Sequence, residues 1–305
     1  PRILFVDTYY PAVLKSRNLS ITGLPYEKGL SNLLGVGFGT ADFASSAMRQ
    51  AGWEARDIVA NADSLQAAWR SEHGRTAIDS EERVRTVLAQ VLEFDPDVVA
   101  VQAASFFGTN ELEELRKQGR VIVLFASYAL DAHVPLELYD VMFTSFPHYE
   151  ASYGKRVRVE YLPLAFSPEA IPKEPDPARD IPVSFVGGLG YRHIWRAAES
   201  VLEAVAREIP SFSWWGYGQG NLAADSALRK AWKGEAWGRE MYRIYRRSKI
   251  VVNRHGEIAQ GFANNMRLFE ATGSGAMVLT EDAPNLCHLF LPGQEIVPYS
   301  SGADL

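Results

Sequence analysis

Short apolar runs alternate with longer amphipathic segments along most of the chain. Each run is rich in valine, isoleucine, leucine and phenylalanine, and each has the length of a strand that is buried on both faces. We therefore expect strands at residues 2–7, 97–102, 120–125, 140–144, 157–162, 182–186, 212–215, 250–253 and 276–279, with one more beginning near Glu54.

The segments between these runs carry apolar residues at helical spacing, so they predict helices. The expected helices cover residues 41–50, 64–72, 81–93, 111–117, 191–209, 241–248 and about 264–271. A long loop that contains Tyr9, Tyr10 and Tyr26 is expected after the first strand. Because strands and helices alternate, the sequence predicts an α/β fold with parallel sheets covered on both faces.

A proline-rich segment marks the expected domain boundary. Residues 166–182 read FSPEAIPKEPDPARDIP, in which prolines lie among charged residues, and this composition favours an extended linker. We predict a Rossmann-like domain at 1–168, a linker at 169–182 and a second Rossmann-like domain at 183–305. A chain of 305 residues is long enough for two domains that each bury a core.

Composition and charge limit the classes of partner. The chain is 47% hydrophobic and 22% charged, with a net charge of −6, which is typical of a globular protein in water. The Arg-rich segment RIYRRSK is interpreted as a solvated helix face, so a nucleic acid is not expected as a partner. A single cysteine, Cys287, fits a reducing compartment. We find no signal peptide and no run long enough to cross a bilayer, and we expect a cytoplasmic protein. No feature of the sequence indicates an oligomeric state.

The densest group of polar residues follows the expected strand IVVN. The loop after it contains Arg254, His255 and Glu257, and Asn264 and Asn265 stand at the start of the next helix. In an open parallel sheet, ligands bind where strand carboxyl ends meet helix N-termini, whose N–H groups attract anions. A phosphorylated ligand is therefore expected here. The alternative is structural: the asparagines cap the helix and the histidine packs without touching a ligand.

Glycines follow two other expected strands, in the sequences FVGGLG and WWGYGQG. Glycine lets the backbone approach phosphate oxygens closely, although ordinary turns also use it. Two arginines at the start of the next helix could meet the same anion, and nearby aromatic rings, Trp215 among them, could stack on a nucleobase or belong to the core. The residues that these regions offer to a nucleotide are Gly187, Gly188, Arg192, Arg196, Tyr217 and Trp237.

Asp95-Pro96-Asp97 has the spacing of a D-x-D metal motif. Pro96 ends the preceding helix and Asp97 opens a strand, so structural roles are favoured over metal binding. We predict no metal site and no cofactor.

Segments of the second half resemble the spore-maturation CgeB-like family of GT-B glycosyltransferases. They are, in order, FVGGLGYRH, WWGYGQG, KIVVNRHGEIA, ANNMRLFEATGSGAMVLTE and PNLCHLFLPGQEIVPY. The first half is similar to the family's more variable partner domain in DVVAVQ and VEYLPLAF. The resemblance implies two Rossmann-like domains that face a central cleft, with a nucleotide-sugar donor on the second and an acceptor on the first. It also implies that the second domain continues beyond Leu305.

The resemblance also implies roles for single residues. In retaining enzymes of this fold a helix carries E-x7-E, whose second glutamate holds the ribose, and LFEATGSGAMVL matches around Glu270. Phe262 stands where the first glutamate would be, and Gln260 and Glu257 lie near that place. The implied donor ligands on this helix are Asn264, Asn265, Arg267 and Glu270. Arg254 would stabilise the leaving phosphate, and His255 would bind the donor's phosphate or its sugar.

A general base would come from the first domain, with Asp7, His133 and His148 as candidates. If the leaving phosphate takes the proton instead, no side-chain base is needed. We predict a metal-independent, retaining glycosyltransferase that moves a sugar from a nucleotide sugar to the hydroxyl of a glycan, protein or small molecule. Two alternatives stay open: a nucleotide-sugar 2-epimerase of the same fold, and a nucleotide-sugar-binding protein without turnover.

Overall fold

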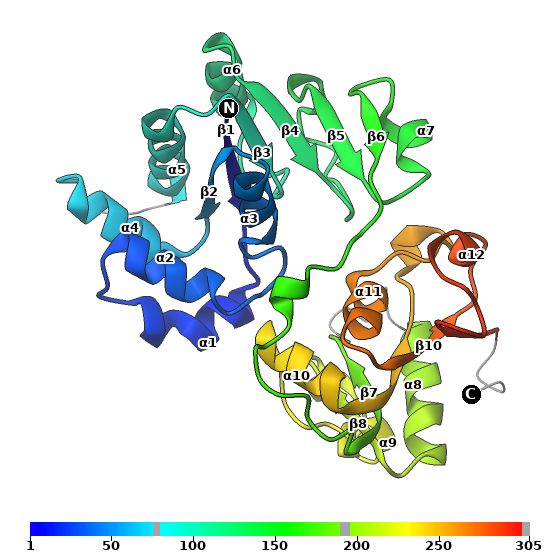
Figure 1. Ribbon diagram of the computed structural model, residues 1–305. Helices are drawn as coiled ribbons and strands as arrows, with labels where there is room; N and C mark the ends of the chain where they lie inside the picture. Colours follow the sequence, from blue (N-terminus) through cyan, green and yellow to red (C-terminus); the bar gives the residue numbers. More distant parts are fainter. Residues whose placement is uncertain (76–79, 190–195, 301–305) are drawn as a thin grey trace. The chain divides into compact units, whose positions relative to one another are not determined.

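The chain divides into two compact units, Pro1–Pro163 and Leu164–Leu305. The structure is a computed structural model that describes residues 1–75, 80–189 and 196–300. Each unit is described by itself below, with the labels of Figure 1. Among the described residues, no helix combines the length and the apolar character that a membrane span requires.

The first unit contains a parallel sheet of six strands in the order β2-β1-β3-β4-β5-β6 (Figure 1). In β1, the second strand in this order, four consecutive residues are buried: Ile3, Leu4, Phe5 and Val6. Neighbouring side chains in a strand point to opposite faces, so helices and loops cover both faces of the sheet. The strands are β1 (Arg2–Asp7), β2 (Glu54–Val59), β3 (Val98–Val101), β4 (Val121–Phe125), β5 (Val141–Thr144) and β6 (Val159–Tyr161). The predicted strands of this half are confirmed, each to within two residues at its ends.

Four helices of the first unit, α3 to α6, agree with the prediction, whereas α7 and the helices after β1 are not predicted. The prediction of a long loop there is wrong, because α1 (Pro11–Ile21) and α2 (Tyr26–Leu34) fill this region. Pro11 opens α1 in its first turn, where its missing N–H breaks no helix bond. Tyr26 is buried at the start of α2, and its hydroxyl hydrogen-bonds Gln90 at 2.7 Å. The remaining helices are α3 (Phe43–Gln50), α4 (Asp63–Glu72), α5 (Ser80–Phe94), α6 (Thr109–Lys117), η1 (Leu136–Leu138) and α7 (Tyr149–Tyr153).

The second unit contains a parallel sheet of five strands in the order β11-β10-β9-β7-β8. The strands are β7 (Ile181–Val186), β8 (Phe212–Trp215), β9 (Ser248–Asn253), β10 (Met277–Glu281) and β11 (Val297–Tyr299). The sequence predicts the first four and misses β11, which is short and contains Pro298. Because β9 lies between β7 and β10, the carboxyl ends of these three strands meet at one edge of the sheet.

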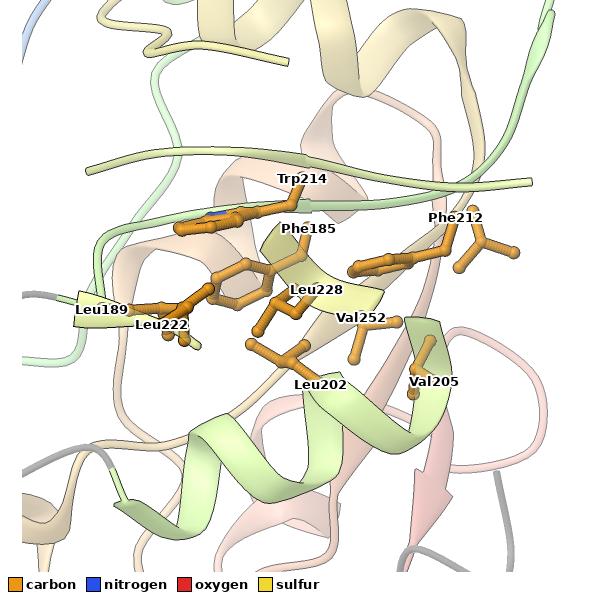
Figure 2. Packing of buried hydrophobic residues seen from close by; sticks show 10 residues of the cluster. Phe185, Leu189, Leu202, Val205, Phe212, Trp214, Leu222, Leu228 and Val252 are labelled. Atoms are coloured by element: carbon orange, nitrogen blue, oxygen red, sulfur yellow. The ribbon is translucent and has the colours of Figure 1, made fainter. Parts of the chain in front are cut away.

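Helices of the second unit are α8 (Arg196–Glu208), α9 (Ala227–Lys230), α10 (Arg239–Arg247), α11 (Met266–Gly273) and α12 (Leu286–Leu289), with 3-10 turns η2 (Pro168–Ala170), η3 (Gln219–Asn221) and η4 (Glu257–Ala259). Leu202 and Val205 of α8 pack against Phe185 of β7 and Trp214 of β8, which form the centre of the core shown in Figure 2. The expected helix at 191–209 is confirmed for 196–208, and its first residues lie outside the described part of the chain.

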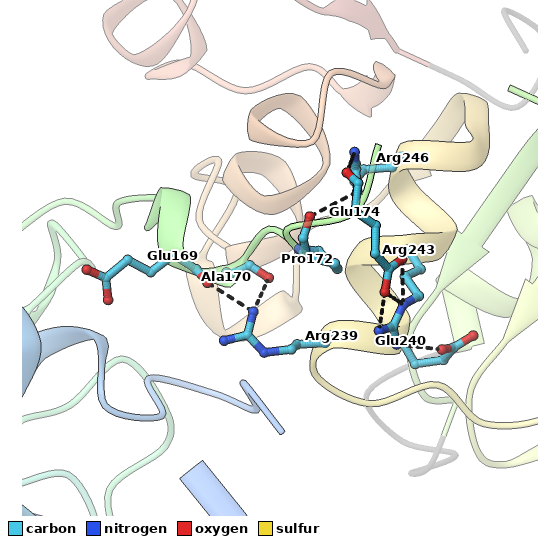
Figure 3. A network of polar contacts seen from close by, with 8 residues as sticks. All are labelled: Glu169, Ala170, Pro172, Glu174, Arg239, Glu240, Arg243 and Arg246. Atoms are coloured by element: carbon cyan, nitrogen blue, oxygen red, sulfur yellow. Dashed lines mark hydrogen bonds and ion pairs between the residues drawn. The ribbon is translucent and has the colours of Figure 1, made fainter. Parts of the chain in front are cut away.

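The proline-rich segment is fastened to α10 of the second unit (Figure 3). Arg246, which is 7% exposed, donates to the carbonyl oxygens of Pro172 at 3.1 Å and Glu174 at 2.9 Å, and it pairs with Asp176 at 2.7 Å. Arg243 pairs with the Glu174 carboxylate at 2.8 Å. The prediction that RIYRRSK is a solvated face is therefore wrong for Arg246, because the main-chain carbonyls of an extended segment attract a guanidinium.

Candidate functional site

Asn253 joins the elements that meet at the carboxyl edge of the second sheet. It is the last residue of β9 and is fully buried. Its Nδ2 donates to Thr280 Oγ1 of β10 at 2.9 Å, and its main-chain carbonyl accepts from the Tyr299 hydroxyl of β11 at 3.0 Å. Its Oδ1 accepts from Asn265 Nδ2 at 2.8 Å and from Arg267 Nη1 at 3.1 Å. The first turn of α11 is thus fixed to the end of β9.

Asn265 is the N-cap of α11, as predicted. It has extended backbone angles, and its Oδ1 accepts from Leu268 N at 3.3 Å. Its Nδ2 also donates to the Arg254 carbonyl, which ties the cap to the loop after β9. Asn264 stands one residue before the cap and is half-buried. The cap leaves the N–H groups of the first turn at the strand edge, where an anion is favoured.

Arg254 and His255 follow Asn253, and Glu281 at the end of β10 holds both. The Glu281 carboxylate pairs with Arg254 Nη2 at 2.6 Å and accepts from His255 N at 2.9 Å. His255 Nε2 lies 3.2 Å from the Glu281 carbonyl oxygen and 3.2 Å from Thr280 Oγ1. Sequence reasoning missed Glu281. Its position directly after an apolar strand is the only sequence signal that could have found it.

Three polar atoms of this pair are buried without a hydrogen-bond partner among the described residues. They are Nε and Nη1 of Arg254 and Nδ1 of His255. An unpaired buried polar group costs about 1–3 kcal/mol, and a charged one costs more. Burial, together with the nearby cations Arg254 and Arg267, lowers the pKa of His255, although its contacts with Glu281 oppose the shift. The ring is therefore neutral at pH 7.

The glycine loop after β7 is packed against Arg267 and Tyr217. Arg267 Nε donates to the Val186 carbonyl at 2.7 Å, and its guanidinium stacks on the Phe185 ring at 4.4 Å. A Cβ on Gly187 would lie 2.3 Å from Arg267 Nη2, and a Cβ on Gly188 would lie 2.2 Å from the Tyr217 ring. These glycines are required by close packing within the protein itself.

Tyr217 and Trp237 stack on one another. Their ring centroids are 5.9 Å apart with an interplanar angle of 17°. The Trp237 indole N–H also donates to Glu235 Oε2 at 3.0 Å. Since the Gly188 backbone lies against the Tyr217 ring, that ring has protein neighbours in Gly188 and Trp237. The structure brings these two aromatic residues and the glycine loop together, as the nucleotide-site hypothesis requires.

Glu270 is buried on α11 and does not belong to a solvated helix face. It is 8% exposed, and Tyr242 OH donates to its Oε1 at 3.2 Å. Burial raises the pKa of Glu270 to about 7, against the lowering effects of Arg267 and Tyr242. Glu257, by contrast, is exposed in η4. Arg192 lies outside the described residues, as does the side chain of Arg196.

Asp7 in the first unit lies at the carboxyl end of β1, where a ligand-facing residue is expected. It accepts from Thr8 N at 2.7 Å and from the Thr40 hydroxyl at 3.4 Å. Burial raises the pKa of Asp7 to about 6. A carboxyl group with this pKa is suited to accepting a proton near neutral pH.

His148 follows β5 and precedes α7. It is half-buried, burial lowers its pKa, and within the described chain its Nδ1 has no hydrogen-bond partner. His133 is exposed. Asp7 ends β1 and His148 follows β5, and because β3 and β4 lie between these two strands, the strands are about 14 Å apart. They are alternative candidates for a base.

The two aspartates of the D-x-D sequence have structural partners. Asp95 pairs with the buried Arg120 at 2.6 Å, and Asp97 accepts from the main-chain N–H of Arg2 at 2.7 Å. Within residues 1–75, 80–189 and 196–300, no group of three or more His, Cys, Asp or Glu is placed to hold a metal ion.

Comparisons with known proteins give one family match and a group of structures with a similar fold. Residues 192–305 match the model of a family described as glycosyl transferase-like. The chain is similar to the Anabaena protein HepE, solved in complex with UDP-glucose, with a TM-score of 0.55 and 12% identity over 99% of this chain and 87% of that one. This likeness shows the GT-B fold class: two parallel α/β units. No curated protein matches the sequence.

Two further solved structures have TM-scores below 0.5 and support no additional conclusion. One is the lipopolysaccharide outer core galactosyltransferase WaaB, with a TM-score of 0.49 and 13% identity over 100% of this chain and 88% of that one. The other is the UDP-GlcNAc 2-epimerase of Neisseria meningitidis, with a TM-score of 0.44 and 11% identity over 93% of this chain and 83% of that one. The resemblance to the CgeB-like family stays a prediction.

Proposed function

We propose that the protein transfers a sugar from a nucleotide-sugar donor to an acceptor hydroxyl and that its second unit binds the donor. One observation carries the proposal: Arg254 stands at the carboxyl end of β9, and its buried Nε and Nη1 atoms have no hydrogen-bond partner among the described residues. This position lies beside the N-terminus of α11, within the segment that matches the glycosyl transferase-like family. Both features favour an anion such as a diphosphate.

Transfer requires that the bond between the anomeric carbon and the phosphate oxygen breaks while the acceptor oxygen bonds to that carbon. Negative charge gathers on the leaving phosphate. Arg254 and the N–H groups behind the Asn265 cap would stabilise that charge, and one such donor lowers the barrier by about 3–4 kcal/mol. Because fixed cations and dipoles provide this stabilisation, we propose that the reaction needs no metal ion.

Glu270 and the aromatic pair are proposed to hold the nucleoside. The ionised Glu270 carboxylate can accept hydrogen bonds from two ribose hydroxyls. Because its pKa is about 7, part of the population is protonated at neutral pH, and only the ionised form accepts two such bonds. Ribose binding should therefore weaken as the pH falls below 7. Tyr217 and Trp237 provide the stacked rings for the base.

We further propose that the configuration of the donor is retained. In front-face attack the leaving phosphate oxygen takes the acceptor proton, so no side-chain base is required. Within the described part of the second unit, the carboxylate beside Arg254 is Glu281, which is already paired with that arginine. If attack comes instead from the opposite face, Asp7 is the base of the first unit that we propose, because its raised pKa suits proton transfer near neutral pH.

The test is conversion of UDP-glucose, UDP-N-acetylglucosamine and GDP-mannose, each with and without a mixture of sugar acceptors. A transferase forms glycoside only when an acceptor is present. Interconversion of the donor sugar without acceptor would instead identify an epimerase, and binding without conversion would identify a binding protein. Activity that survives excess chelator supports the metal-free step, and loss of activity in chelator refutes it.

A further inference from the structure

His255 has a hydrogen-bond pattern that fixes which of its nitrogens carries the proton. Its Nε2 faces the Glu281 carbonyl oxygen, a group that can only accept. Nε2 must therefore carry a hydrogen. Thr280 Oγ1, which accepts from Asn253 Nδ2, is a second acceptor for the same N–H. In the neutral ring the lone pair is then on Nδ1.

The charges around the ring favour this neutral form. The guanidinium groups of Arg254 and Arg267 oppose a further positive charge, and burial disfavours it as well. The Glu281 carboxylate favours the cation, but it is already shared between Arg254 and the His255 main-chain N–H. The Nδ1 lone pair is thus an acceptor with no partner among the described residues.

An acceptor lone pair cannot bind a phosphate oxygen, which is itself an acceptor. The Nε and Nη1 atoms of the neighbouring Arg254, which have no partner in the part of the chain that the structure describes, are donors and can bind one. Arg254 therefore presents hydrogen-bond donors, and His255, the next residue, presents an acceptor. In a nucleotide sugar, an anionic phosphate is directly followed by a ring that bears hydroxyl donors.

We propose that His255 Nδ1 accepts a hydrogen bond from a hydroxyl of the donor's sugar, while Arg254 binds the adjoining phosphate and Glu281 positions both residues. The inference rests on the proposed function and assigns His255 to sugar recognition, not to phosphate binding. All three unpaired atoms are shielded from solvent. A ligand reaches them once the protein atoms that cover them move aside.

The experiment measures affinity by calorimetry for matched pairs: UDP-glucose against UDP, UDP-N-acetylglucosamine against UDP, and GDP-mannose against GDP. In His255→Ala, the sugar nucleotide that binds wild type should bind about fivefold more weakly, which is the effect of one neutral hydrogen bond. The affinity for the free nucleotide should stay within about twofold. Unchanged nucleotide affinity also shows that the variant is folded.

Two further variants separate the hydrogen bond made by His255 from the positioning of Arg254 by Glu281. His255→Asn places an amide oxygen near the position of Nδ1 and should restore part of the lost affinity. Glu281→Gln removes the charge that holds Arg254. It should therefore lower the affinity for the free nucleotide and for the sugar nucleotide by the same factor. His288→Ala, a change of an exposed histidine in the same unit, is the matched control and should change neither.

Deoxy analogues of the bound sugar identify the hydroxyl. Wild type should bind one deoxy analogue about fivefold more weakly than the parent sugar nucleotide. His255→Ala should bind that same analogue as tightly as it binds the parent. Equal loss of nucleotide and sugar-nucleotide affinity in His255→Ala, or no loss at all, overturns the assignment while leaving the proposed function intact. If wild type binds none of these nucleotides, the proposed function fails, and the assignment fails with it.

Discussion

Glu270→Gln should change how the stability of the protein depends on pH. In the unfolded chain this carboxyl has the ordinary pKa of 4.5, and burial in the folded state raises it to about 7. Between these values the unfolded state releases the proton while the folded state keeps it, so the free energy of unfolding falls as the pH rises. A shift of about 2.5 units corresponds to a loss of about 3 kcal/mol, complete above pH 7.

The glutamine variant lacks this titration, and its amide oxygen can still accept from Tyr242. Relative to wild type, Glu270→Gln should therefore gain about 2.5 kcal/mol between pH 5 and pH 8, and the rest of the difference falls below pH 5. Unfolding in guanidinium chloride, followed by tryptophan fluorescence of the ligand-free protein, measures the difference at each pH. Other buried carboxyls, such as Asp57, titrate in both proteins and cancel in the comparison.

Glu208→Gln is the matched control, because Glu208 is an exposed glutamate of the same unit. Its stability should follow that of wild type at every pH. If Glu270→Gln also stays parallel to wild type from pH 5 to pH 8, then Glu270 ionises as it does in water. The inference that protein atoms shield this carboxyl from solvent would then be wrong, and with it the reasoning that ribose binding depends on its ionisation.

Three other substitutions have distinct expected results. Arg254→Ala should lower kcat about 10²–10³-fold and weaken donor binding less, as steady-state kinetics would show, because the charge on the leaving group develops late; an equal loss in both would place the effect in the ground state. Gly188→Ala should abolish nucleotide binding in calorimetry, since the new methyl group would lie 2.2 Å from the Tyr217 ring; normal binding would show that the ring can move without consequence. Arg246→Met should cost about 3 kcal/mol in denaturant unfolding, because it removes the hydrogen bonds to the carbonyls of Pro172 and Glu174 and the ion pair with Asp176; a cost below 0.5 kcal/mol would contradict the anchoring role.

The sequence predicts every strand of the two sheets except β11, because most of them are compact apolar runs that end in a glycine or a polar residue. Local signals also predict the start of α11, since Asn265 caps the turn that directly follows it. The helices after β1 escape prediction because α1 mixes polar and apolar residues without a clear stripe and α2 contains Gly29. Gly29 is nevertheless needed there, because a Cβ would lie 2.6 Å from Leu65.

Contacts that depend on strand register could not be predicted. Glu281 reaches Arg254 and His255 because β10 pairs with β9 so that Thr280 lies opposite Asn253. In the sequence, the whole of α11 and its flanking loops lie between these residues. No local pattern indicates which residue of β10 lies opposite Asn253. The central role of Asn253 has the same origin, because its partners lie on β10, β11 and α11.

The hydrogen bond between Asn253 and Asn265 has a consequence for protein engineering. It joins the two ends of the segment 254–264, so the base of this segment is set by the end of β9 and the cap of α11. Doubling the length of such a loop adds only about 0.6 kcal/mol of closure entropy. Segments of other lengths could therefore be grafted between these two asparagines while the sheet beneath keeps its geometry, which makes this position suitable for altering substrate preference.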